Sequence, residues 1–464
     1  MMILSRDILN KDLVYDGVDY APLCDMIDYW KILLWEKYSV RPGHSVSAIV
    51  ALTDVYYVSL VIACLELGVS LAVTDKPIHN NFYGVRQRLY GPMQLALVDE
   101  LNWEDSQLTC AHQYFKHVDN IKIFDDYKIQ DPSLWNKIAK KIFAKPDSIA
   151  ILTTTSGTSK SPTVVKHTHE WILDSSIRAV KILNFHKDEI VLHTRQLSHG
   201  SILDLFLLPS LMTVDQHHMF NYNSGNVEQL VDYVITHKIN KFIVFSSITK
   251  ILETLPVLDH TLTIITAATP SKNIVPLIKS KNISSFIVSY GSSESGNNIL
   301  MTSITPLTDQ LTYDPNNYGP LHDDHYSLEL FDDHVVVEVK KFKKKVKLND
   351  KLEFRNGNYY FYNRTDQYRI NDVFISELNI STVSKSITEL NHDVIIDAEF
   401  DSIYLAFYED FDPQIVNHVN RLLAEKIHKN TFISKAVRVD YDSIAPAYKP
   451  LKDVIRNFAR SQNI

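Results

Sequence analysis

The first part of the chain alternates amphipathic helical segments with short apolar strands. Residues 21–38, APLCDMIDYWKILLWEKY, place apolar side chains every three or four positions, which predicts a helix with one buried face. RPGH breaks this pattern, SVSAIVAL has the pattern of a buried strand, and DVYYVSLVIACLELGVSLAVTD predicts a second helix and strand. Strand, helix, strand order with short turns favours a parallel sheet covered by helices.

The same alternation continues to about residue 291. The predicted elements are the strand SIAILTTT, the helix HEWILDSSIRAVKIL, the strand EIVLHT, the helix VEQLVDYVITHK, the strand KFIVFS, the helix SSITKILETL and the strands LTIITAA and SSFIVSYG. Several of these strands end in polar or small residues. Those residues lie at the carboxyl ends of the strands, where open α/β sheets usually bind ligands.

The pattern changes after about Tyr313. YSLELF, HVVVEVKKF and GNYYFYNR are short alternating segments that predict antiparallel strands or a small barrel. From about Arg364 a smaller α+β unit follows, with DPQIVNHVNRLLAEKIH as its clearest helix. We therefore predict an α/β protein with a large N-terminal domain, 1–363, and a smaller C-terminal domain, 364–464.

Length and composition are those of a globular protein with more than one domain. The chain has 464 residues, of which 45% are hydrophobic and 22% charged, close to the average for soluble domains. The net charge of −8 argues against nucleic-acid binding as the main function, because phosphate binding needs a basic surface. We expect no nucleic-acid partner.

One basic segment departs from this charge balance. Its six lysines are Lys340, Lys341, Lys343, Lys344, Lys345 and Lys347. A solvated strand face or hairpin is favoured over a site for a polyanion.

The cysteines and the apolar segments point to a cytoplasmic protein. Cys24, Cys64 and Cys110 lack the spacing of a metal site, and an odd number of cysteines indicates reduced thiols. The N-terminus lacks the pattern of a signal peptide, and the most apolar stretch, 57–73, is interrupted by Glu66 and is short for a bilayer span. We predict no membrane helix.

A loop rich in hydroxyl groups follows the strand SIAILTTT. Residues 153–169, TTTSGTSKSPTVVKHTH, surround Gly157 with Ser and Thr. Backbone N–H groups and hydroxyls of such a loop can converge on an anion, which makes it a candidate triphosphate site. An ordinary Ser/Thr-rich connection is the alternative, and the spacing of a Walker loop is absent.

This loop resembles the phosphate-binding loop of the adenylate-forming superfamily, which includes acyl- and aryl-CoA synthetases, adenylation domains and luciferases. The superfamily pattern is T-S-G-T-T-G-x-P-K-G-V followed by T-H. Its further motifs are matched in order by LSHGSILDLFLLPSL, TAATP, SYGSSES, LNDKLEFRNGNYYFYNRTD and APAYKPLKDVIR. The matches span nearly the whole chain.

The resemblance implies a reaction and its cofactors. A carboxylate of a small-molecule acid attacks the α-phosphate of ATP in the presence of Mg²⁺, which gives an acyl-adenylate and pyrophosphate. Transfer to a thiol usually follows, so CoA or the phosphopantetheine of a carrier protein acting in trans is an implied acceptor. Because two anions must meet, the protein neutralises and aligns them.

The resemblance also assigns nucleotide-binding residues. Glu294 would bind Mg²⁺, with an exposed surface charge as the alternative interpretation. Ser293, in place of the superfamily's Thr, could donate a hydrogen bond to the α-phosphate, and Tyr290 would line the adenine beside Ala268 and Gly291. The β- and γ-phosphates would be held by Thr155, Ser156, Gly157, Thr158 and Ser159.

Four more residues follow from the later motifs. Asp350 would accept both ribose hydroxyls, unless it is only a turn residue. Arg364 would hold ribose or phosphate, and Asp366 would be the hinge of a mobile C-terminal lid domain. Lys452 would neutralise the carboxylate and the α-phosphate, with Lys449 as a substitute.

His199 bears on the substrate. Amino-acid adenylation domains carry an Asp at the matching position, which pairs with the α-ammonium group. A neutral histidine lacks that charge, so an acid without an α-amino group is favoured. A loop histidine satisfied by backbone groups is the alternative.

The chain departs from the superfamily pattern at two places. Lys160 replaces the second glycine of the phosphate loop and Thr163 its lysine, although Lys160 and Lys166 could restore positive charge. After Asp366, QYRINDVFISEL lacks the glycine of a loop that helps to form the thiol channel. A carrier protein, an amine or another nucleophile therefore stays open as acceptor, as does a non-catalytic protein that only binds a nucleotide or acyl-adenylate.

Overall fold

The structure is a computed structural model, which describes most of the chain. The described residues are 4–49, 54–73, 93–98, 115–154, 164–194, 203–220, 222, 226–244, 248–267, 274–322, 324–364, 368–370, 373–375, 380–381, 383–384, 387–388, 390, 392–397, 402–407, 410–427 and 431–438.

The larger of two main sheets has eight strands in the order β14-β13-β12-β11-β9-β10-β1-β2. All neighbours pair in parallel except β2 with β1 and β14 with β13, which lie at the two edges. The strands are β1 (Val14–Tyr15), β2 (Val18–Asp19), β9 (Ile190–His193), β10 (Gln216–Met219), β11 (Lys241–Ile243), β12 (Thr263–Thr266), β13 (Ser285–Ser292) and β14 (Gly296–Ile304).

Helices pack on both faces of this sheet. Phe242, Ile264 and Phe286 share a hydrophobic cluster with residues of the helices α9 (Val227–Thr236), α10 (Ile248–Thr254) and α11 (Ile274–Ser280). On the other face Ile243 and Ile265 cluster with residues of α6 (His169–Ile182) and of the π-helix η4 (Leu203–Leu207), which continues into α8 (Leu208–Thr213). The alternation predicted from the sequence is therefore present as a helix-covered, mainly parallel sheet.

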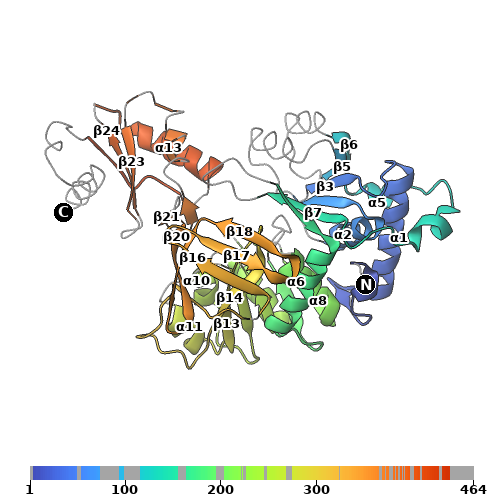
Figure 1. The fold of residues 1–464 in the computed structure, drawn as a ribbon, viewed down its shortest axis with the longest axis horizontal. Coiled ribbons are helices and arrows are strands. Elements are labelled where there is room, and N and C mark those ends of the chain that lie inside the picture. Colours follow the sequence, from blue (N-terminus) through green and yellow to red (C-terminus); the bar gives the residue numbers. More distant parts are fainter. Residues whose placement is uncertain are drawn as a thin grey trace.

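The second main sheet has six strands in the order β6-β5-β3-β4-β7-β8, in which only β8 runs antiparallel to its neighbour. Its strands are β3 (Ser45–Ile49), β4 (Ser70–Val73), β5 (Met93–Val98), β6 (Phe115–Asn120), β7 (Ile149–Thr154) and β8 (Val164–Thr168). It lies beside the helices α1 (Tyr20–Glu36) and α2 (Val55–Leu67), on the right in Figure 1. Short elements complete this part: η1 (Arg6–Ile8), α5 (Ile123–Asp126) and the π-helix η3 (Trp135–Ala139).

Helix α2 has well-defined ends. The Asp54 side chain accepts a hydrogen bond from the Tyr57 N–H, which satisfies a free donor at the helix start. Gly68 ends the helix at φ +68°, and a Cβ there would lie 3.1 Å from the Ala144 Cα. The left-handed conformation of Gly68 and the close approach of the backbone at Ala144 both favour glycine at this position.

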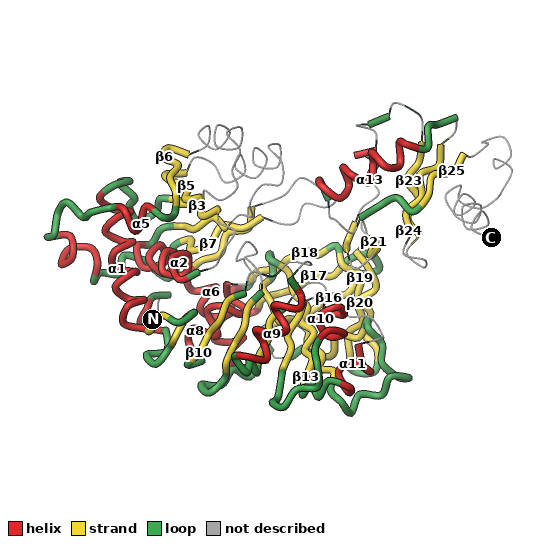
Figure 2. The backbone as a smooth tube through the Cα atoms, turned by 180° about the vertical axis from the view of Figure 1, so that it is seen from behind, coloured by secondary structure: helices red, strands yellow, loops and turns green. Residues whose placement is uncertain are grey.

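The strands after Tyr313 form antiparallel sheets, as expected. One three-stranded sheet has the order β15-β20-β19, and another has the order β16-β17-β18. These strands are β15 (Asn317–Gly319), β16 (Tyr326–Leu330), β17 (Val335–Val339), β18 (Lys344–Leu348), β19 (Asp350–Arg355) and β20 (Asn358–Arg364). Figure 2 shows the two sheets next to each other.

The lysine run is confirmed as a hairpin. Lys340, Lys341 and Phe342 form the short helix η5 between β17 and β18. Among the described strands β18 is an edge strand, and its Lys345 and Lys347 are exposed. Lysine on an edge strand opposes pairing with another chain.

The C-terminal part has its own hydrophobic cluster. The strands β21 (Tyr368–Ile370) and β22 (Val373–Ile375) form a hairpin, and β23 (His392–Asp397), β24 (Ser402–Phe407) and β25 (Lys435–Arg438) form a sheet beside α13 (Gln414–Lys426) (Figure 1). Its buried apolar residues lie between Ile375 and Ile433, whereas those of the main cluster end at Phe361. The boundary between 363 and 364 stays a prediction.

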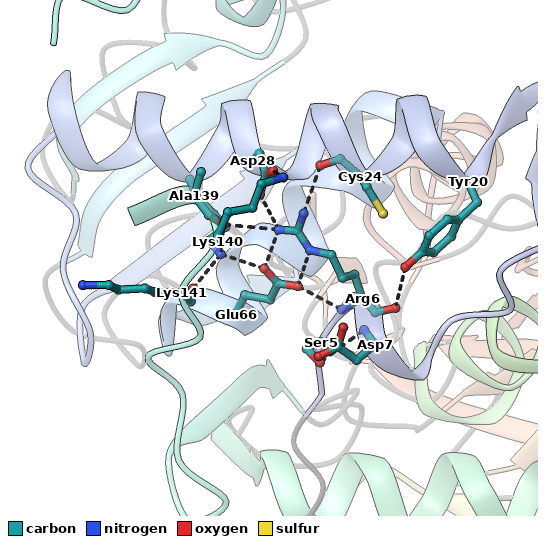
Figure 3. A network of polar contacts seen from close by, with 11 residues as sticks. Ser5, Arg6, Asp7, Tyr20, Cys24, Asp28, Glu66, Ala139, Lys140 and Lys141 are labelled. Carbon is teal, nitrogen blue, oxygen red and sulfur yellow. Dashed lines mark hydrogen bonds and ion pairs between the residues drawn. The ribbon is translucent and has the colours of Figure 1, made fainter. Parts of the chain in front are cut away.

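Buried charges join the N-terminal segment to α1 and α2 (Figure 3). The Glu66 carboxylate accepts hydrogen bonds from Arg6 at 2.8 and 2.7 Å and from Lys31 at 2.7 Å. Arg6 also pairs with Asp28, 2.7 Å away, and Asp28 contacts Lys140. Glu66, which interrupts the apolar stretch 57–73, is therefore neutralised by partners distant in sequence.

Within the described residues no helix is long and apolar enough to cross a membrane. Cys24 and Cys64 are free thiols, and Cys110 lies outside the described residues.

Candidate functional site

Part of the predicted site lies outside the described residues. This holds for His199, Ala268, Asp366, Lys449, Lys452, Lys160, Thr163 and the five loop residues Thr155, Ser156, Gly157, Thr158 and Ser159. Arg364 is the last residue of β20, where the structure describes only the backbone. The described candidates are Tyr290, Gly291, Ser293, Glu294 and Asp350.

Tyr290 and Asp350 are brought into direct contact. Tyr290 lies near the carboxyl end of β13, and Asp350 is the first residue of β19. The Tyr290 hydroxyl donates a 2.6 Å hydrogen bond to the Asp350 Oδ2, and both residues are buried. Tyr318 and Phe361 pack against the Tyr290 ring. The bond fixes the orientation of the Asp350 carboxylate.

Ser293 and Glu294 lie in the tight turn that joins β13 to β14. Its third residue, Ser295, donates its N–H to the Ser292 hydroxyl at 3.1 Å. Gly296 then has φ +91°, and a Cβ there would lie 2.8 Å from the Tyr326 hydroxyl. The turn is therefore held by an internal hydrogen bond and by close packing that only glycine permits.

Glu294 is held by its backbone rather than by its carboxylate. Its carbonyl oxygen accepts a 2.9 Å hydrogen bond from the Lys344 Nζ, which lies 4.5 Å from the centroid of the Trp171 ring. Burial lowers the pKa of Lys344, and the charge of Glu294 opposes this shift. Among the described residues the Glu294 carboxylate accepts no hydrogen bond, so its oxygens are available to a cation.

His167 connects this turn to the strand that follows the hydroxyl loop. It lies on β8, is 5% exposed, and packs against Trp171. Burial lowers its pKa to about 4, the charge of Lys344 acts in the same direction, and a hydrogen bond with the Ser293 backbone opposes the shift. The segment after residue 163 and the Ser293–Glu294 turn therefore lie side by side.

Sequence reasoning missed His167 and Lys344. His167 lies within the quoted loop motif, but the motif itself does not distinguish it from Lys166, which is exposed on the other side of β8. Lys344 belongs to the lysine run, where nothing in the local pattern separates it from its exposed neighbour Lys345. Strand alternation places the buried His167 and the half-buried Lys344 on inward faces, and it was the available signal.

Two buried histidines lie on adjacent strands of the larger sheet, His193 at the carboxyl end of β9 and His217 near the start of β10. The ring centroids of His193 and His217 are 4.5 Å apart. His217 contacts the Ser210 hydroxyl at 2.8 Å, whereas in the described part of the chain neither nitrogen of His193 has a hydrogen-bond partner. Burial lowers the pKa of His193 to about 3.

This burial predicts a loss of stability in acid. The unfolded imidazole takes up a proton below about pH 6.5, whereas folded His193 does so only near pH 3, so stability falls as the pH drops through that window. We expect His193→Phe to reduce the slope of unfolding free energy against pH by about 1.4 kcal/mol per pH unit near pH 5. Urea unfolding at several pH values measures this, with the exposed His186→Phe as control. Equal slopes for the two variants would refute the assignment.

Comparisons with known proteins find structural relatives only. No family model and no curated protein matches the sequence. A double mutant of o-succinylbenzoate CoA synthetase (MenE) from Bacillus subtilis, bound to its product analogue OSB-NCoA, is 16% identical with a TM-score of 0.71, over 95% of this chain and 93% of that chain. The amide bond synthetase McbA from Marinactinospora thermotolerans is 13% identical with a TM-score of 0.74, over 98% of both chains.

A third relative and further MenE structures complete the comparison. McyG A-PCP complexed with phenylalanyl-adenylate is 13% identical with a TM-score of 0.64, over 99% of this chain and 96% of that chain. Other structures of MenE hold AMP, the acyl-adenylate OSB-AMP, or ATP with a magnesium ion. These relatives are adenylate-forming enzymes, and the likeness covers both the helix-covered sheets and the C-terminal part. The chain therefore has the adenylate-forming fold.

Proposed function

We propose that the protein uses MgATP to activate a carboxylic acid as an acyl-adenylate with release of pyrophosphate. The observation that carries the proposal is the buried, hydrogen-bonded pair of Tyr290 and Asp350. Tyr290 lies near the carboxyl end of β13, and the turn that contains Ser293 and Glu294 begins three residues after it. Open α/β sheets bind ligands at this edge. The motif order and the fold of enzymes that hold acyl-adenylates support the same reaction.

The described residues fit a nucleotide with a hard cation. The Glu294 carboxylate is half-buried and accepts no hydrogen bond from a described residue, and carboxylate oxygen is a preferred ligand of Mg²⁺. Mg²⁺ would supply charge neutralisation at the phosphates. Asp350, oriented by Tyr290, would accept hydrogen bonds from the two ribose hydroxyls, and Ser293 would donate to the α-phosphate.

The remaining roles follow from the motifs alone. We propose that residues 155–159 hold the β- and γ-phosphates and that Ala268 and Gly291 lie along the adenine. Arg364 would contact ribose or phosphate, and Lys452 would neutralise the attacking carboxylate and the α-phosphate together. His199 would border the acid and favours one without an α-amino group.

We further propose that residues 364–464 form a lid that turns about Asp366. The separate hydrophobic clusters before Phe361 and after Ile375 support two units that can move against each other. The activated acyl group would then pass to a thiol, either CoA or the phosphopantetheine of a carrier protein. The free thiols of Cys24 and Cys64 support a cytoplasmic setting.

The test is acid-dependent exchange of labelled pyrophosphate into ATP, with a panel of fatty, aryl, hydroxy and amino acids. We expect exchange with one class of acid lacking an α-amino group. Lys452→Ala is expected to abolish it and Lys449→Ala to retain it, and the reverse result would identify Lys449 as the catalytic lysine. Binding of ATP without exchange for any acid would contradict the proposal and indicate a non-catalytic nucleotide-binding protein.

A further inference from the structure

The lysine hairpin makes contacts that the proposed reaction does not use. Lys341 pairs with Asp174 of α6 at 2.7 Å, and the Phe342 ring lies 4.7 Å from the Trp171 ring. Lys344 extends from the start of β18 to the Glu294 carbonyl. The hairpin is therefore anchored on α6 and reaches from there to the turn that carries Ser293 and Glu294.

Lys344 differs from the other lysines of the hairpin in its surroundings. Its ammonium lies over the Trp171 ring and donates to the backbone of Glu294, whereas Lys345 and Lys347 are exposed. Removing an ammonium group from water is unfavourable unless it is hydrogen-bonded or paired. The aromatic face and the carbonyl oxygen provide that compensation at this one lysine.

The partner of Lys344 is a backbone group in a short turn. Lys344 donates to the backbone of Glu294, whose carboxylate is the proposed metal ligand. A hydrogen bond to the backbone of this residue restricts the positions that its carboxylate can reach. His167 contacts the neighbouring Ser293 backbone, and Gly296 packs under the Tyr326 hydroxyl. Of the contacts named here, the bond from Lys344 holds the ligand residue itself.

We infer that Lys344 is a positioning residue, which holds the Glu294 turn so that the carboxylate meets the cation of MgATP. The inference rests on the proposed function. Lys344 acts through the position of Glu294 and needs no contact of its own with the nucleotide. Residues that orient a metal ligand commonly change metal affinity by about 10- to 100-fold when they are replaced.

The experiment measures ATP binding by titration calorimetry, with Mg²⁺ and with EDTA. We expect Lys344→Met, which keeps the stem on Trp171, to weaken ATP binding about ten-fold with Mg²⁺ and to leave it unchanged in EDTA. Lys344→Arg, which can donate to the same carbonyl and lie on the same ring, is expected to stay within about three-fold of the wild type. The control Lys345→Met removes an exposed lysine of the same strand and is expected to change neither value.

A double variant tests whether Lys344 acts through Glu294. In a Glu294→Gln background, Lys344→Met is expected to cause no further loss of Mg²⁺-dependent affinity. Additive losses, equal losses with Mg²⁺ and with EDTA, or a Lys344→Met variant that behaves as Lys345→Met would each overturn the inference. Unchanged thermal unfolding of Lys344→Met excludes a merely structural effect.

These outcomes separate the inference from the proposed function. Mg²⁺-dependent differences in ATP affinity without any acid-dependent exchange would leave the inference standing and refute the reaction. Exchange in the wild type, combined with no effect of Lys344→Met, would refute the inference alone. ATP binding that is independent of Mg²⁺ in the wild type would refute both.

Discussion

Replacing Glu294 by Gln is expected to reduce the rate of acid-dependent ATP–pyrophosphate exchange by about 100- to 1,000-fold. The substitution keeps the size of the side chain but removes the negative charge that we assign to the cation of MgATP. The Glu294 backbone would still accept the bond from Lys344, so the turn itself should persist. The measurement is the exchange rate at saturating acid over a range of Mg²⁺ concentrations.

The matched control is Glu329→Gln. Glu329 is exposed on β16, in the same small sheet as Lys344, and its substitution removes the same charge without touching the turn. We expect it to leave exchange unchanged. A Glu294→Gln variant that retains exchange within about three-fold of the wild type would show that the carboxylate is not the cation ligand, because loss of such a group costs far more.

Regular elements of the fold were predictable because their patterns are local. Residues 169–183 were expected to be helical and form α6, which ends at Ile182, and SSFIVSYG, residues 284–291, matches β13 to within one residue at each end. Strand β14 was missed. Its sequence, GNNILMTSI, carries Asn298 in a strand interior, where the side chain is buried and accepts a 2.6 Å hydrogen bond from Ser289 on β13. The sequence around Asn298 does not indicate that its side chain has a buried hydrogen-bond partner on another strand.

In the candidate site, too, single residues were predictable from local motifs, whereas their contacts with distant residues were not. Tyr290 and Asp350 were identifiable from motifs, but their hydrogen bond joins residues 60 positions apart. The roles that motifs assign to Ser293 and Glu294 stay predictions, while the bonds of their backbone groups to His167 and Lys344 come from the structure alone. Contacts of this kind depend on how β8, α6 and β18 pack against one another. The hydrophobic pattern of each element predicts its buried face but not which element covers that face.

The second large effect is expected at Glu66, whose replacement by Gln should destabilise the protein by about 3–5 kcal/mol. Burial alone would raise the pKa of Glu66, but the hydrogen bond from Arg6 and the charge of Lys31 hold it below its usual value. The substitution would leave the buried Lys31 and the partly buried Arg6 with Asp28 as the remaining counter-charge of the described network. An uncompensated buried charge costs more than the pair contributes.

Lys31 makes this site especially sensitive. Its ammonium donates to Glu66 at 2.7 Å and to the carbonyl oxygens of Ala139 and Lys141 at 2.6 and 2.7 Å, and the residue is fully buried. These bonds tie the end of η3 and the segment after it to α1 and α2. We therefore expect Lys31→Met combined with Glu66→Gln to cost less than the sum of the two single substitutions, because the double variant removes both charges.

Urea unfolding followed by tryptophan fluorescence measures the free energy of unfolding of each variant. All five tryptophans lie at or before Trp171, so the signal reports on the part of the chain that contains Glu66. The ion pair of Lys187 and Asp12 is the control, with a similar separation of 2.6 Å but 62% and 64% exposed side chains. Asp12→Asn is expected to cost about 0–1 kcal/mol, since water screens an exposed pair. Equal losses for Asp12→Asn and Glu66→Gln would show that burial of the network does not determine its contribution to stability.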